Sequence, residues 1–339
     1  MSMAAPLSVS VPEAGTAHRA AMRGLMRSGP ARLRAIWLLV WCVSLCLGVG
    51  ASLLVARPAV AAEVQIRDQR GQLLRLAQPP QRIVSLLPSL TEAVCALGAC
   101  ARLVATDRSS NWPASVAAVP KVGGLEDAQI ERIVALKPDV VLAARSSRAI
   151  ERLEALGQRV VVLKATNHAE VRDTLVTLAT LLGQPAQGAQ LWRAIEAQLQ
   201  QAAARVPAAV RGQKVYVEVD AAPYAAGAAS FVGETLARLG MNNIVPAALG
   251  PFPKLNPEFV VKAQPELVMV VDRNAAEMIR RPGWASLRAL QQGRVCAFPS
   301  ARYDILVRPG PRLGEAALVL ADCLAGLGAA PPAASGARQ

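Results

Sequence analysis

One arrangement of polar and apolar positions occurs twice in this chain, far apart in the sequence. At residues 131–142 and again at residues 258–269, a Glu opens a short apolar run at helical spacing. A Pro follows seven residues later, and an acidic residue then leads into a second apolar run. Because a proline cannot continue a helix, the pattern predicts a short helix, a break and a buried strand. The repetition of this unit predicts two similar lobes with a cleft between them.

Short apolar runs, of the length of buried strands, alternate with helical patterns along most of the chain. The predicted strands cover residues 82–87, 103–106, 139–144, 160–163, 214–219, 266–271 and 294–298. The predicted helices between and after them cover residues 90–97, 147–156, 168–182, 230–239, 258–263 and 314–327. This alternation is typical of an α/β fold with mostly parallel sheets and helices on both faces.

An uninterrupted helical pattern at residues 185–206 separates the two halves. Leu191, Ile195 and Leu199 lie on one side of it, at the spacing of an amphipathic helix. A helix of this length spans roughly 30 Å. We therefore expect one rigid helix to join an N-terminal lobe at residues 63–184 to a C-terminal lobe at residues 207–327. The Ala- and Pro-rich residues 328–339 are predicted to be a disordered tail.

Residues 1–62 have the pattern of a secretory leader. Arginines at positions 19–34 precede an apolar stretch at residues 35–55, and small residues at 59–61 provide a cut site. This order is typical of a cleaved signal peptide and predicts a periplasmic protein. The alternative is a retained membrane anchor, because the apolar stretch is long enough to span a bilayer. Neither Cys42 nor Cys46 follows the small residue that lipid attachment needs, so a lipoprotein is not expected.

Charge and cysteine content narrow the classes of function. The formal net charge is +13, but the arginines are scattered and form no basic run, so nucleic-acid binding is not expected. An oxidising compartment permits disulfides among the cysteines beyond the leader. Four cysteines allow three pairings, one of which links the end of a predicted helix to the loop after it through Cys95 and Cys100. The other two cysteines are Cys296 and Cys323.

Motifs of common enzyme classes are missing from the sequence. There is no G-x-S-x-G elbow, no phosphate-binding G-x-x-x-x-G-K-[ST] loop and no G-x-G-x-x-G after a strand, so an enzyme is not expected.

His168 is the single histidine beyond the leader. Its position at a helix start favours a capping or surface role, and it predicts no metal site. Ser89 and Glu92 have the spacing of a helix capping box.

Several of these segments resemble one known family. They are residues 82–92, the Trp112-Pro113 loop, residues 121–124 and residues 131–139. Over about residues 81–325 the chain resembles the periplasmic substrate-binding proteins of ABC importers for iron-siderophores, haem and cobalamin, and most of all the branch that binds cobalamin. The resemblance implies the class III periplasmic binding protein fold, in which one long helix joins two α/β lobes and the lobes move little when ligand binds.

The resemblance also implies a function and partners. A member of this family captures a metal chelate and delivers it to an inner-membrane permease dimer with its ATPase. For this chain the resemblance favours cobalamin or another corrinoid as the chelate. It works without a cofactor, and we expect a monomer. In the family, one Glu on each lobe docks onto permease arginines, and the matching residues are Glu131 and Glu258. A carboxylate–arginine pair gives orientation as well as attraction, although the helix macrodipole alone also favours acids in a first turn.

A large, partly flat chelate needs aromatic and apolar surface, and aromatic residues make up only 4% of this chain. Three of them stand in predicted loops that match or adjoin ligand contacts of the cobalamin-binding branch: Trp112, Tyr224 and Phe252. Asp304 and Arg308 fall in a predicted loop that the family uses to hold polar groups of the ligand, and a surface salt bridge between them is the alternative. Trp192 and Trp284, by contrast, are expected to serve packing.

Two departures from the cobalamin-binding pattern leave a second ligand class open. Leu125 stands where those members have a Trp, and Ser109 stands where they have a Tyr. Arg108 and Arg302 favour an anionic ligand instead, such as a carboxylate siderophore or the propionates of haem. Tyr224 or Tyr303 is then a candidate axial ligand to a haem iron.

Overall fold

The computed structural model describes residues 63–220 and 223–329, and every structural statement below concerns these residues. The predicted leader lies outside them, as does the predicted tail beyond residue 329. No helix in the described ranges is both long enough and apolar enough to cross a membrane.

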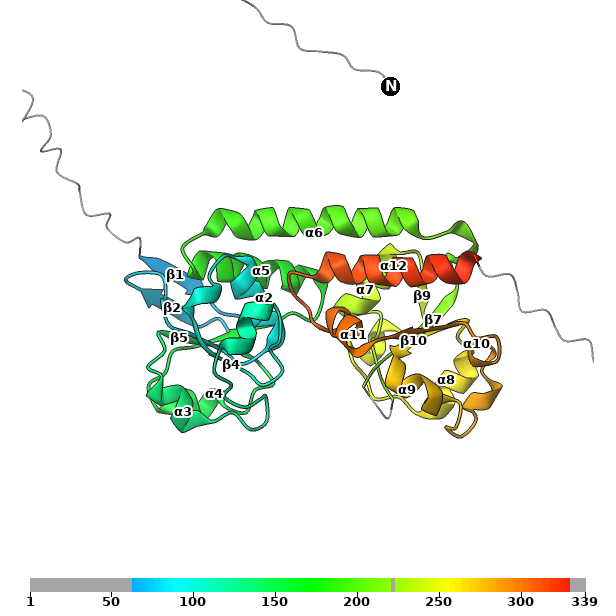
Figure 1. The fold of residues 1–339 in the computed structure, drawn as a ribbon, viewed down its shortest axis with the longest axis horizontal. Coiled ribbons are helices and arrows are strands. Elements are labelled where there is room, and N and C mark those ends of the chain that lie inside the picture. Colours follow the sequence, from blue (N-terminus) through cyan, green and yellow to red (C-terminus); the bar gives the residue numbers. More distant parts are fainter. Residues whose placement is uncertain (1–62, 221–222, 330–339) are drawn as a thin grey trace, which may run out of the picture. The chain divides into compact units, whose positions relative to one another are not determined.

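The N-terminal lobe is built on a four-stranded parallel sheet with strand order β4-β3-β5-β6 (Figure 1). The strands are β3 (Ile83–Ser85), β4 (Leu103–Thr106), β5 (Val140–Ala144) and β6 (Val160–Leu163). The helices are α2 (Pro88–Ala96), α3 (Ile130–Ala135), α4 (Ile150–Ala155) and α5 (His168–Leu181), with 3-10 turns η1 (Cys100–Arg102) and η2 (Ala114–Ala118). An antiparallel hairpin of β1 (Val64–Arg67) and β2 (Leu73–Leu76) precedes the sheet. Strand β6 is buried at every position, as expected for a parallel sheet covered on both faces.

The C-terminal lobe has a second sheet with strand order β11-β10-β7-β8, in which β9 also pairs with β7. All of these pairings are parallel except that of β7 with β8. The strands are β7 (Lys214–Asp220), β8 (Tyr224–Ala225), β9 (Asn242–Asn243), β10 (Leu267–Val271) and β11 (Val295–Phe298). The helices are α7 (Phe231–Arg238), α8 (Pro257–Ala263), α9 (Asp272–Met278), α10 (Arg288–Gln291) and α11 (Ser300–Val307), with 3-10 turns η3 (Ala208–Val210), η4 (Ala247–Leu249) and η5 (Trp284–Ser286).

The long helix α6 (Pro185–Arg205) joins the two lobes and packs against α5 of the first lobe and against the last helix, α12 (Leu313–Ala329) (Figure 1). Ile195, Leu199 and Ala202 form its buried stripe, at helical spacing. The predicted fold class, two α/β lobes with mostly parallel sheets and one long joining helix, is confirmed. The last helix runs to Ala329, so its end lies beyond the residue 327 that the sequence predicted.

The repeated sequence unit is repeated in backbone conformation as well. Lys137 and Gln264 each precede the proline of their unit, and they are the two non-glycine residues in the described ranges with positive φ, +46° and +45°. A left-handed residue ends a helix, and the proline after it prevents continuation. The acid that follows each proline then caps a neighbouring strand: Asp139 accepts the N–H of Arg82 at 2.8 Å, and Glu266 accepts the N–H of Lys214 at 2.8 Å.

Two predictions about local structure were wrong. Helix α2 begins at Pro88 with Leu87 as its N-cap and without a side-chain cap, so Ser89 and Glu92 form no capping box. Proline at the first helical position has no N–H to satisfy, which removes part of the need for such a cap. The predicted loop that holds Asp304 is the helix α11. Helices α9 and α10 were not predicted, because short helices have weak periodic patterns.

The prediction of a cap or surface role for His168 was also wrong. The cap of α5 is Asn167, which accepts the N–H of Glu170, and His168 is buried against α7 of the other lobe. Its Nε2 lies 3.0 Å from the carbonyl oxygen of Phe231 and 2.9 Å from the hydroxyl of Thr235. Burial lowers the pKa of His168, so the ring is held neutral.

Each lobe contains one disulfide. Of the three pairings that the sequence allowed, the structure has Cys95 with Cys100 and Cys296 with Cys323. The first links the end of α2 to η1. The second links β11 to α12, so it ties the last helix to the sheet of its own lobe. The packing predictions hold as well: Trp284 is fully buried, and Trp192 is half-buried against the core.

Candidate functional site

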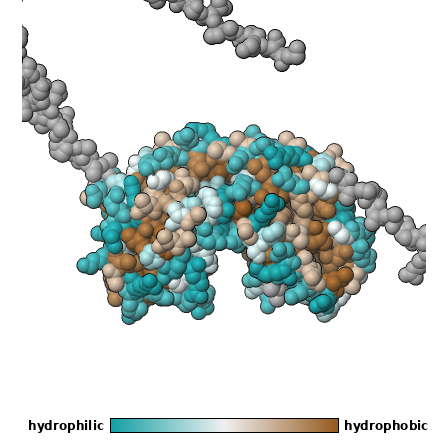
Figure 2. Space-filling model, viewed as in Figure 1, coloured by the Kyte–Doolittle hydropathy of each residue, from teal (hydrophilic) through white to brown (hydrophobic). Residues whose placement is uncertain are grey.

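A pocket of about 520 Å³ lies at the carboxyl ends of β3 and β4 in the N-terminal lobe. Open parallel sheets bind ligands at this edge, because the loops after the strands meet there. The pocket lining comes from three loops: Leu86, Leu87, Pro88, Asp107, Arg108, Ser109, Gly124, Leu125, Glu126 and Asp127. Figure 2 shows an open notch between the two lobes, on the side opposite α6 as Figure 1 draws it.

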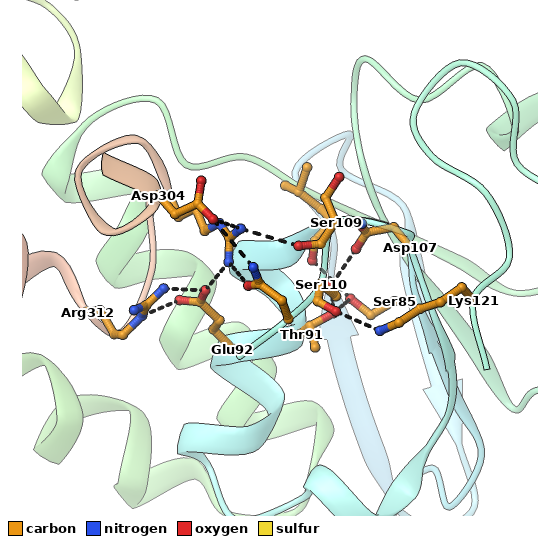
Figure 3. Close-up of polar contacts among 12 residues, drawn as sticks. Ser85, Thr91, Glu92, Asp107, Ser109, Ser110, Lys121, Asp304 and Arg312 are labelled. Carbon is orange, nitrogen blue, oxygen red and sulfur yellow. Dashed lines mark hydrogen bonds and ion pairs between the residues drawn. The ribbon is translucent and has the colours of Figure 1, made fainter. Parts of the chain in front are cut away.

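The loop after β4 rests on a buried polar network (Figure 3). Asp107 is buried and accepts hydrogen bonds from the hydroxyl of Ser110 and the N–H of Ser109. Lys121 donates to the carbonyl oxygen of Ser110 at 2.6 Å and to the hydroxyl of Thr106 at 2.8 Å. Burial raises the pKa of Asp107 and lowers that of Lys121, because both lose water. The hydrogen bonds in turn fix the course of the loop up to Ser110.

A second network joins the same loop to the segment between α11 and α12 (Figure 3). Glu92, in the middle of α2, is 1% exposed and accepts two hydrogen bonds from Arg312, at 2.7 and 2.8 Å. Arg308 donates to the same carboxylate at 3.0 Å. It also donates to Asn111 at 2.7 Å and to Asp304 at 2.6 Å. A buried carboxylate is therefore fully paired by arginines from a segment more than two hundred residues later.

The Trp112 ring contacts this network on one side and is exposed to solvent on the other. The guanidinium carbon of Arg312 lies 4.7 Å from the centre of the Trp112 ring, which is the geometry of a cation–π contact. The Trp112 side chain is nevertheless 38% exposed. One large aromatic surface thus remains available beside the pocket loops.

The two aromatic residues predicted in the C-terminal lobe are exposed as well, Tyr224 at 40% and Phe252 at 37%. Tyr224 begins β8 at the carboxyl end of β7, and it pairs with Lys254 in an isolated bridge. The Phe252 ring lies 5.8 Å from that of Phe231. Strand pairing thus places Tyr224 at the carboxyl end of β7, and the ring contact places Phe252 beside Phe231, the first residue of α7.

The structure places the remaining predicted contacts differently. Asp304 is on α11 and forms an ion pair with Arg308, the contact that the alternative prediction named. Ligand contact by either side chain stays a prediction. The pair is not isolated on the surface, because the Arg308 side chain is only 10% exposed and also binds Glu92. Arg108 lines the pocket and pairs with Asp127, whose pKa that hydrogen bond lowers. Arg302 is exposed on α11.

Glu131 and Glu258 occupy equivalent positions. Each is exposed and is the second residue of its helix, α3 or α8, and neither forms an ion pair with another described residue. Figure 1 shows α3 and α8 on the side of their lobes that faces away from α6. The helices that carry Glu131 and Glu258 therefore lie on the same side of the molecule.

Glu92 and Arg312 were not identified as site residues from the sequence. The signal that was available is a Glu in the apolar run of α2, where burial without a partner would be costly. The partner arginines could not be found, because no local pattern relates residues so far apart. In the described ranges, no group of three or more His, Cys, Asp or Glu side chains is arranged to hold a metal ion.

Comparison with known proteins identifies the family of this chain. The model of the family described as periplasmic binding protein matches residues 83–301. The chain belongs to this family. Its members are substrate-binding transport proteins rather than enzymes, and those of the ABC type work with a permease and an ATPase.

Relatives cover most of the chain. An uncharacterised ABC transporter substrate-binding lipoprotein of Bacillus subtilis is 29% identical over 77% of this chain and 85% of its own. The vitamin B12-binding protein of Pectobacterium atrosepticum is 28% identical over 75% of this chain and 92% of its own.

Solved structures of the same kind superpose on the chain. The periplasmic vitamin B12 binding protein of Vibrio cholerae has a TM-score of 0.62 at 24% identity, over 74% of this chain and 99% of its own. A periplasmic heme binding protein of Pseudomonas aeruginosa has a TM-score of 0.64 at 26% identity, over 75% and 95%. The predicted membership of the cobalamin, haem and siderophore superfamily and its class III fold are confirmed, while the individual ligand is not decided.

Proposed function

We propose that this protein is the periplasmic binding component of an ABC importer, exported by a cleaved signal peptide at residues 1–62, and that it captures a corrinoid such as cobalamin. The observation that carries the proposal is the exposure of Trp112 in one lobe and of Tyr224 and Phe252 in the other. In a chain with so few aromatic residues, three exposed rings on loops beside the strand ends suit a large, partly flat ligand.

Titration of the purified protein with cyanocobalamin and cobinamide tests this proposal. We expect both to bind, and we expect Trp112→Ala and Tyr224→Ala each to weaken binding about tenfold, because each removes one stacking surface. Leu156→Ala is the matched control, since Leu156 is equally exposed but ends α4. If neither corrinoid binds, or if the control weakens binding as much, the corrinoid proposal is wrong.

A ferric siderophore or haem is the second candidate. Exposed Arg302 and the pocket residue Arg108 favour an anionic ligand, and Leu125 replaces an aromatic residue of the cobalamin-binding branch. Haemin titration followed by absorbance distinguishes this candidate. A haem complex with an iron-coordinating tyrosine gives a characteristic spectrum that Tyr224→Phe should abolish. A corrinoid binder should give no such spectrum.

Delivery to the permease is proposed to use Glu131 and Glu258, whose equivalent exposed positions support docking by both lobes. We expect Glu131→Gln and Glu258→Gln to leave ligand affinity unchanged and to lower uptake in cells, with the double variant most impaired. The matched control is Glu151→Gln, because Glu151 is an exposed acid in the first turn of α4, in the same lobe as Glu131. Normal uptake by the double variant would contradict this role.

A further inference from the structure

The structure contains the same three-part arrangement in each lobe, a buried carboxylate, an arginine and an indole ring. In the C-terminal lobe, Glu218 binds Arg281 through both carboxylate oxygens, and the Arg281 guanidinium carbon lies 4.7 Å from the Trp284 ring. In the N-terminal lobe, the carboxylate is Glu92, and its arginine lies at the same distance from Trp112. The two indoles differ in one respect, because Trp284 is fully buried whereas Trp112 is 38% exposed.

The N-terminal arrangement differs in a second way, since it crosses between the lobes. Glu92 lies on α2 beside the first sheet, and both of its arginines lie between α11 and α12 of the second lobe. The arginines hold the loop before the indole on two sides: Arg308 binds Asn111, and Arg312 lies against the Trp112 ring. If the carboxylate is neutralised, both guanidinium groups lose their common negative partner, and only one of its two oxygens still accepts without restriction.

We propose that Glu92 is a positioning residue for the ligand: through Arg312 and Arg308 it fixes the orientation of the exposed Trp112 ring. This inference rests on the proposed function in assigning Trp112 to the ligand surface. Arg312 occupies one side of the ring, so the ligand stacks on the exposed remainder. Because the two arginines belong to the opposite lobe, the Trp112 orientation also depends on the relative placement of the lobes, and a ligand that bridges them meets a preset surface.

The first experiment needs no ligand. The protein is labelled with 5-fluorotryptophan, and the fluorine NMR signal of Trp112 is assigned by its loss in Trp112→Phe. We expect Glu92→Gln and Arg312→Lys to shift or broaden the Trp112 signal while those of Trp192 and Trp284 stay in place, which shows that the fold is intact. Glu218→Gln is the matched control and should move the Trp284 signal instead. An unchanged Trp112 signal in both Glu92→Gln and Arg312→Lys overturns the proposal.

The second experiment is a double-mutant cycle with cyanocobalamin, or with haemin if haemin is the compound that binds. Glu92→Gln alone should weaken binding about tenfold, the scale of one ordered aromatic contact. In a Trp112→Ala background it should have no further effect, because Glu92 acts through the ring. Equal loss in both backgrounds overturns the proposal. If neither compound binds the unsubstituted protein, the proposed function fails, and the NMR result alone decides the role of Glu92.

Discussion

At the scale of single residues, the two lobes share a strained backbone position. Lys137 and Gln264 adopt the left-handed conformation that normally favours glycine, and each does so at the end of the repeated helix. Their surroundings differ. Lys137 is exposed, whereas the Gln264 side chain donates to the carbonyl oxygen of Val261 at 2.9 Å. A side-chain hydrogen bond thus partly offsets the strain at Gln264 in the C-terminal lobe, whereas the Lys137 side chain in the N-terminal lobe has no such bond with the described residues.

This difference gives a direct test of the cost of the left-handed residue. We expect Lys137→Gly to raise the free energy of unfolding by about 0.5–1 kcal/mol. Glycine removes the strain of the left-handed conformation, and this gain exceeds the extra backbone entropy that glycine loses on folding. Gln264→Gly should gain less, since it also loses its hydrogen bond. Urea unfolding of the three proteins measures both changes. A larger gain at Gln264 than at Lys137 would contradict the explanation.

At the scale of elements, the joining helix is held close to its neighbours. Gly188 on α6 is buried against α5, and a Cβ placed there would lie 2.7 Å from the Cα of Val176. Backbone atoms cannot give way as the tip of a side chain can, so the two helices approach more closely than any larger residue permits. Rigid joining of the lobes therefore depends on this contact as well as on the continuity of α6.

We expect Gly188→Ala to destabilise the protein by about 1–2 kcal/mol, because the clash with α5 outweighs the better helix propensity of alanine. The matched control is Gly326→Ala on α12. A Cβ at Gly326 meets nothing within 4 Å, so this variant should gain about 0.5–1 kcal/mol. Thermal and urea unfolding measure both. If the contact between the helices sets the effect, Gly188→Ala must lower the free energy of unfolding and Gly326→Ala must raise it. If helix propensity sets it, both must raise it.

At the scale of the whole described molecule, the larger of two apolar clusters is shared by both lobes, and the smaller belongs to the N-terminal lobe alone. A single cluster of buried residues includes Ile83 of the first sheet, Met269 of the second, and Ile195 and Leu320 of the two long helices. Hydrogen bonds also cross between the lobes, for example from the N–H of Phe231 to the carbonyl oxygen of Thr166 at 2.7 Å. Lobes connected in this way cannot separate without exposing apolar surface.

We therefore expect the lobes to unfold together. Far-UV circular dichroism and tryptophan fluorescence should report one coincident urea transition, because loss of either lobe removes the packing surface of α6 and α12 for the other. Two separated transitions would show that the lobes are independent and that the shared core contributes little.

The candidate site was only partly predictable from sequence. Trp112, Tyr224 and Phe252 were found because aromatic side chains in loops are conspicuous in a chain that has few of them, and the structure shows all three exposed. The assigned ligand and docking roles stay predictions. Glu92 was misread as a cap residue, because its position in the chain relates it to Ser89, whereas in space it pairs with Arg312.

Local sequence patterns predicted the repeated helix–proline–strand unit, the four strands of the first sheet, strands β7, β10 and β11 of the second, and the long joining helix. These depend on the periodicity of neighbouring residues and on the local effect of proline, which act within a few positions. The folded structure was needed to establish the partners of Glu92 and His168, the pairing of the cysteines and the contact of Arg312 with the Trp112 ring. Those contacts join residues that no local pattern relates, and their free energy exists only once the two lobes have packed on α6.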